Sequence, residues 1–138
     1  IDADILIQHL PPMPFLLPST LRQAIDAVQN RGYDSSFAYY EKNFYLWKNN
    51  EPKYGLKDLH NSFKLPKIGI EGMGMYVAKK VSLCRDKVRI CGEYTPTYIN
   101  AFEAIDIDYP DDLEFARTIA QGFDSESEYI EGINKYRI

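Results

Sequence analysis

Apolar and polar positions repeat with two different periods along the chain, and these periods predict a mixture of strands and helices. Residues 4–7 form a short apolar run of the kind found in a central strand of a parallel sheet. Residues 8–14 contain three prolines, which exclude helix and sheet pairing, so we expect a rigid loop there. The apolar positions then follow the helical period up to Gly32, which predicts a helix with Ser19 or Thr20 as its N-cap.

The middle of the chain favours strands separated by a long loop. Aromatic residues crowd 35–47, which predicts two strands with a turn at 41–43. Residues 48–67 are polar and contain proline and glycine, so we expect an extended loop. Residues 68–77 are strand-like, but their glycines predict a bulge or a close approach of another backbone. Residues 94–99 are a candidate edge strand.

The last third of the chain predicts one further strand and one further helix. Apolar and acidic residues alternate over 103–108, which indicates a strand. Pro110, the acids after it and an apolar stripe predict a helix over 110–122. Strands and helices therefore alternate, and we expect a single α/β domain over residues 1–138 with a largely parallel sheet.

Composition narrows the classes of protein to which the chain can belong. Of its 138 residues, 45% are hydrophobic and 26% are charged, which excludes disordered and fibrous classes. No run approaches the ~18 apolar residues of a membrane span. The net charge of −4 provides no overall attraction to nucleic acid or anionic membrane, so we expect neither as a partner. Cys84 and Cys91 match no zinc pattern or disulfide framework, and free thiols predict a cytoplasmic protein.

Asp106 and Asp108 form the most specific chemical pattern in the sequence. In a strand, residues two apart point to the same face. Two neighbouring carboxylates repel each other unless a cation lies between them or they share a proton. Oxygen ligands near the start of a helix at Pro110 would suit Mg²⁺ that carries substrate phosphates. The alternative is that Asp108 is only the N-cap of that helix and Asp106 an exposed loop residue.

Two further segments carry candidate binding residues. Gln8 and His9 begin the proline-rich loop at the carboxyl end of the first strand, where α/β sheets bind ligands; the alternative is a rigid turn with a partly buried His9. Glu71 and Tyr76 flank glycines that permit close backbone approach, although the segment lacks the features of a phosphate loop. The alternative there is a bulged strand with Met75 or Tyr76 in the core.

Several segments, in order, carry a resemblance to a known family. They are residues 4–15, 19–20 with the helix that follows, 32–35, 65–66, 71–77 and 103–116. In this order they resemble the cytidylyltransferases that activate acidic sugars, which include the acylneuraminate (CMP-sialic acid) synthetases. The last segment is the most specific, because in that family an Ile-Asp-Ile-Asp strand followed by Pro-x-Asp-Leu carries the metal-binding carboxylates.

The resemblance implies a fold and an activity. The fold would be a Rossmann-like nucleotide-diphospho-sugar transferase fold with a mostly parallel sheet, represented by its C-terminal part and lacking the N-terminal nucleotide-binding part. The enzyme would transfer CMP from CTP to an acidic or related sugar and release pyrophosphate. Asp106 and Asp108 would be the catalytic residues that hold Mg²⁺ or Mn²⁺. Gln8, Glu71 and Tyr76 would bind the sugar.

The resemblance also implies a homodimer, built through an arm within residues 45–100. Ser62 and Phe63 stand where the family often has Arg-Gln, and the first loop lacks the family's Thr, Ser and Arg. Loss of an arginine removes a bidentate carboxylate partner, which leaves the sugar open. The alternative function is a non-catalytic module that retains the fold for sugar binding or dimerisation.

Overall fold

The computed structural model describes residues 2–57, 60–123, 128 and 130–132, which form two compact units. The first unit combines the residues up to Tyr40 with those from Glu71 onward, and the second is Glu41–Ile70. Among the described residues, no helix is long and apolar enough to cross a membrane.

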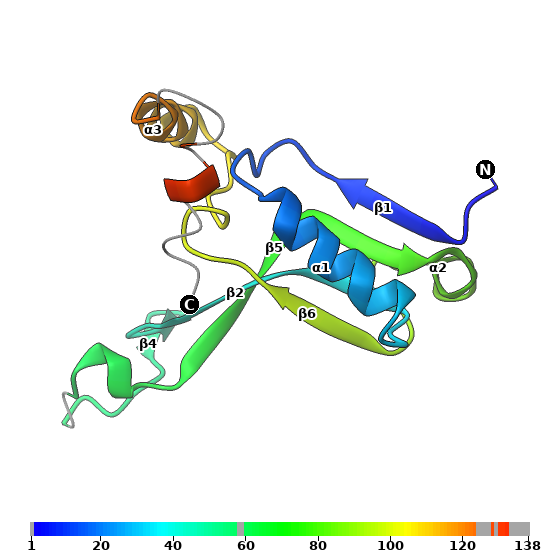
Figure 1. Ribbon diagram of the computed structural model, residues 1–138. Coiled ribbons are helices and arrows are strands. Elements are labelled where there is room, and N and C mark those ends of the chain that lie inside the picture. Colours follow the sequence, from blue (N-terminus) through cyan, green and yellow to red (C-terminus); the bar gives the residue numbers. More distant parts are fainter. Residues whose placement is uncertain (1, 58–59, 124–127, 129, 133–138) are drawn as a thin grey trace. The chain divides into compact units, whose positions relative to one another are not determined.

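The main sheet has four strands in the order β1 (Ile5–His9), β5 (Lys67–Lys79), β2 (Ser35–Asn43) and β6 (Tyr94–Tyr98) (Figure 1). Among the strands that the structure describes, only β2 and β6 form a parallel pair; β5 is antiparallel to both of its neighbours. The expected mostly parallel, Rossmann-like sheet is therefore wrong.

The reason for this difference is the position of β5. A crossover through α1 (Pro18–Gln29) joins β1 to β2, as in a parallel unit. However, β5 lies between these two strands and separates them. The apolar run at 4–7 thus belongs to an edge strand rather than a central one, and β6 is the edge strand that the sequence predicts.

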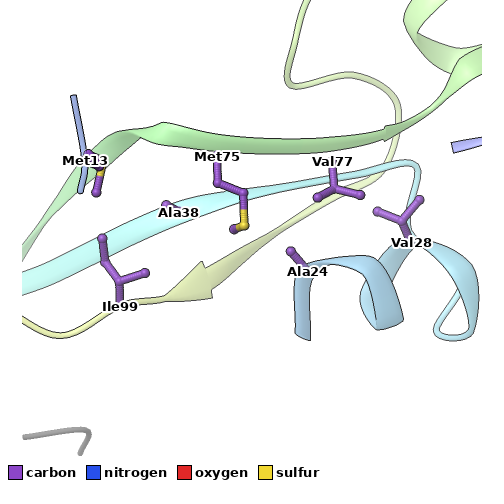
Figure 2. Packing of buried hydrophobic residues seen from close by; sticks show 7 residues of the cluster. All are labelled: Met13, Ala24, Val28, Ala38, Met75, Val77 and Ile99. Atoms are coloured by element: carbon purple, nitrogen blue, oxygen red, sulfur yellow. The ribbon is translucent and has the colours of Figure 1, made fainter. Parts of the chain in front are cut away.

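Helix α1 covers one face of the sheet, and the main core lies between them (Figure 1). Figure 2 shows Met75 and Val77 of β5 directed toward Ala24 and Val28 of α1. The predicted helix is confirmed, but its N-cap is Leu17 rather than Ser19 or Thr20.

The second unit differs from the predicted two strands and loop. Strand β2 continues through the expected turn at 41–43. A short hairpin follows, made of β3 (Trp47–Lys48) and β4 (Glu51–Pro52), and a single 3₁₀ turn spans Ser62–Lys64. Asn49 and Asn50 both have positive φ values (55° and 60°), the conformation that a tight hairpin turn requires. Asparagine adopts this conformation more readily than most residues.

The glycines of β5 produce the predicted irregularity. A Cβ atom on Gly72 or Gly74 would approach Met13, and at Gly74 it would lie 2.6 Å from the Met13 Cβ. Met75 and Val77 belong to the same core cluster as Met13. Even-numbered residues of β5 therefore face the core up to Gly74, and odd-numbered residues face it from Met75 onward, as in a β-bulge. Gly74 is required there because Met13 occupies the space of a side chain.

The first unit also contains α2 (Lys80–Asp86) and α3 (Pro110–Ala120). The predicted helix from residue 110 is confirmed. The predicted strand over 103–108 is wrong, since residues 101–104 form turns and 105–108 form no strand. The chain there is held by side-chain contacts instead of a sheet ladder.

The principal contact is the carboxylate of Glu103, whose residue is 0% exposed. Its Oε1 accepts the N–H of Leu17 at 3.2 Å and the hydroxyl of Thr20. Its Oε2 accepts the N–H of Asn100 at 3.2 Å. Buried carboxylates of this kind are stable because both oxygens have donors. Glu103 thereby joins the start of α1 to the segment that leads into α3.

We predict that Glu103→Ala lowers the free energy of unfolding by about 2–4 kcal/mol, because it leaves buried N–H donors without an acceptor. Urea unfolding followed by circular dichroism would measure the change. The control is Glu114→Ala, whose side chain is 70% exposed and which should change stability by less than about 0.5 kcal/mol. Equal effects of the two substitutions would contradict the role given to Glu103.

Candidate functional site

The predicted acidic pair lies in the irregular segment between Glu103 and α3. Ile105 and Ile107 both pack against a second apolar cluster formed by Phe15, Leu17 and Ala116. The N–H of Ile107 donates to the carbonyl of Pro12 at 2.9 Å, which fixes the segment to the proline-rich loop. Asp106 and Asp108 alternate with these isoleucines, so the acidic pair remains together although the strand that was expected to hold it is absent.

The carboxylate of Asp106 is perturbed by its surroundings. Desolvation by burial raises its pKa, and the negative charges of Asp108 and Asp112 raise it further. A hydrogen bond from the backbone of Ile107 opposes this shift. The like-charge effect shows that the two predicted residues lie close enough to interact, and a bound cation would relieve it.

The start of α3 shows that Asp108 is not its N-cap. The N-cap is Tyr109, and the side chain of Asp112 accepts the backbone N–H groups of Tyr109 at 2.8 Å and Asp108 at 3.1 Å. Asp112 thus satisfies the helix terminus, and the alternative in which Asp108 only caps the helix is wrong. An acid at the third helical position is a capping signal in the sequence.

The carboxylate oxygens of this pair suit a divalent metal ion that prefers oxygen ligands. Within the described parts of the chain, no three His, Cys, Asp or Glu side chains come together as a complete cage. Mg²⁺ commonly takes one or two protein carboxylates and completes its shell with water and substrate phosphates. Asp106 and Asp108 fit that requirement, and Mn²⁺ accepts the same oxygen ligands.

The second group of predicted residues lies on β1 and β5. Gln8 is directly opposite Tyr76 in the antiparallel register, and opposite residues share a face of the sheet. The hydroxyl of Tyr76 donates to Oε1 of Glu71 at 2.5 Å. Burial and this carboxylate raise the pKa of Tyr76 to about 12, so its phenol remains protonated at neutral pH. The structure thus brings together all three residues predicted to bind the sugar, whereas His9 lies opposite Met75.

The proline-rich loop links the two groups of residues. The N–H of Leu10 donates to the carbonyl of Gly74 at 2.8 Å, close to Tyr76 in β5. Two residues further along, the carbonyl of Pro12 accepts the N–H of Ile107, next to the acidic pair. The loop therefore contacts the backbone beside each group.

Sequence reasoning missed two cationic residues, Lys87 and Arg89, between α2 and β6. The guanidinium carbon of Arg89 lies 4.5 Å from the centroid of the Tyr76 ring, a cation–π contact. Both residues line a surface hollow of about 600 Å³ together with Glu71, Leu83, Val88 and Ile90. Residues 87–90 alternate weakly between charged and apolar positions, but this pattern does not identify their neighbours, so only the fold reveals that they adjoin Glu71.

Comparison of the sequence with models of known protein families and with curated proteins found no match.

We predict that Asp108→Asn lowers the pKa of Asp106, because the substitution removes a negative charge that raises it. A carboxyl-carbon NMR titration would measure the shift. Asp111→Asn is the control, since Asp111 is not among the causes of the raised pKa. Identical Asp106 titrations in the parent and Asp108→Asn proteins would contradict the proposed proximity.

Proposed function

We propose that this protein is a sugar cytidylyltransferase, which transfers CMP from CTP to an acidic or related sugar and releases pyrophosphate. The observation that supports this most directly is the Asp106–Asp108 pair, whose carboxylates interact and whose geometry leaves Asp108 out of helix capping. The proposal depends on these residues and on the resemblance of their segment, not on a parallel sheet.

The acidic pair would hold the divalent cation, Mg²⁺ or Mn²⁺, through the oxygens of Asp106 and Asp108. When bound, such an ion neutralises phosphate charge and orients the phosphates for displacement. The raised pKa of Asp106 comes first from burial and then from the negative charges of Asp108 and Asp112, and a bound cation would favour the ionised carboxylate against both effects.

The second group would bind the sugar through three different hydrogen-bonding functions. Gln8 is exposed on β1 and offers both a donor and an acceptor. The oxygen of the protonated Tyr76 phenol can accept a hydrogen bond from a sugar hydroxyl while the phenol donates its own to Glu71. The second carboxylate oxygen of Glu71 can accept a hydrogen bond from another sugar hydroxyl.

The test is a pyrophosphate-release assay on the intact protein with a panel of nucleotides and sugar acids. We expect release with CTP, and we expect Asp106→Asn and Asp108→Asn each to lower kcat/KM by at least about 10²-fold. Asp111→Asn has the same change of charge in the exposed first turn of α3 and should retain near-normal turnover. Near-normal turnover by both site variants would contradict the metal-binding role of the pair. Absence of pyrophosphate release with every nucleotide would contradict the proposed enzymatic activity.

A second candidate function is a non-catalytic module for sugar binding or dimerisation. The observation that favours it is the exposure of large apolar side chains in the second unit, where Trp47 is 53% and Phe63 67% exposed. Soluble monomers rarely expose several such groups in one contiguous patch. Under either function we propose a homodimer formed through the arm that includes this unit.

Trp47→Ala combined with Phe63→Ala should dissociate the dimer, because large aromatic side chains contribute most of the energy of such interfaces. Sedimentation velocity at micromolar concentration would measure the state of the parent and the variant. Phe115→Ala is the matched control, since Phe115 is 58% exposed but lies on α3 in the other unit. A monomeric parent protein would rule out the proposed dimer.

A further inference from the structure

The hollow beside Tyr76 combines features of a binding site for a small anion. Lys87 and Arg89 contribute two positive charges to its lining, and Glu71 contributes the one negative charge. Neither cation makes an ion pair with any residue that the structure describes. Two cations that share a hollow repel each other, so an anion bound between them would be stabilised.

The arginine is already held in position before any ligand binds. Its guanidinium lies over the Tyr76 ring, and that ring is fixed because Tyr76 is only 3% exposed and is hydrogen-bonded to Glu71. A stacked guanidinium keeps its N–H edge available for the two oxygens of a carboxylate or phosphate. Less side-chain freedom is therefore lost when an anion binds.

The loop that carries both cations is held at each end. At its start, Lys87 adopts a left-handed conformation and its N–H donates to the carbonyl of Leu83 at 2.9 Å. At its end, the N–H of Gly92 donates to Asp86 at 2.9 Å, and the N–H of Cys91 donates to the Ser35 hydroxyl at 2.9 Å. These bonds hold the backbone between α2 and β6 in one conformation.

The remaining lining indicates what else the ligand carries. Leu83, Val88 and Ile90 provide apolar contact area, and Glu71 provides a hydrogen-bond acceptor next to the cations. An inorganic anion would use none of these groups. A ligand with hydroxyl groups and C–H surface would use all of them.

We propose that this hollow binds a small hydroxylated anion, with Arg89 and Lys87 on its charged group and Glu71 on a hydroxyl. The assignment of the ligand to the sugars rests on the proposed function. Recognition of the acidic group is thereby assigned to Arg89 and Lys87, which lie outside the segments that carry the family resemblance. The charged group is a carboxylate or a phosphate, and the hydroxyls are those of a sugar.

The test is direct binding to the chain, measured by NMR titration with glucuronate, glucose 6-phosphate, glucose and inorganic phosphate as probes. We expect one of the two sugar anions to bind at least about tenfold more tightly than glucose and than inorganic phosphate. Arg89→Gln and Lys87→Gln should each weaken that binding about tenfold or more. Arg22→Gln, the same change on the exposed surface of α1, should leave it unchanged.

Equal binding of glucose and the sugar anions, or undiminished binding by Arg89→Gln, would overturn the inference. Binding of inorganic phosphate alone would also overturn it, because the hydroxyl and apolar contacts would then be unused. Asp106→Asn separates this result from the proposed function, since it should abolish pyrophosphate release yet leave binding of the sugar anion intact. Anion binding without any pyrophosphate release would support the anion-binding site and contradict the proposed enzymatic activity.

Discussion

The arrangement of the candidate site depends on one buried carboxylate. Glu103 accepts backbone donors from Leu17 and Asn100 and the hydroxyl of Thr20, so it joins the first turn of α1 to a segment more than eighty residues later. The residues that follow have no strand partner to hold them. Glu103, together with the bond from Ile107 to Pro12, replaces a sheet ladder as the constraint that keeps Asp106 and Asp108 side by side.

The second constraint is the close contact between Met13 and the glycines of β5. Met13 fills the space beside Gly74, and the alternation of core-facing side chains along β5 shifts by one residue there. Without that change, Tyr76 would share a face with Gly74 and point into the core beneath α1. With it, Tyr76 reaches Glu71 and Arg89 on the opposite face. A packing requirement in the core thus decides that Tyr76 meets Glu71 and Arg89 on the opposite face of the sheet.

The sequence could predict the local elements but not their neighbours. The helical stripe of α1, the proline and acids at the start of α3, and the glycines of β5 all act within a few residues, so their patterns were sufficient. The position of β5 between β1 and β2 depends on pairing across some seventy residues, which no local period records. Glu103 looked like one acid in an alternating strand, and Arg89 carried no signal, because their partners come from distant segments.

The two edges of the main sheet differ in their capacity for growth. Edge strand β6 contains Pro96, and proline within a strand leaves no N–H for a further neighbour at that position. The other edge, β1, has no proline and carries Ile7, which is 47% exposed. A further strand, from this chain or another, can therefore extend the backbone hydrogen bonds of the sheet beside β1. Beside β6 these hydrogen bonds would be interrupted at Pro96.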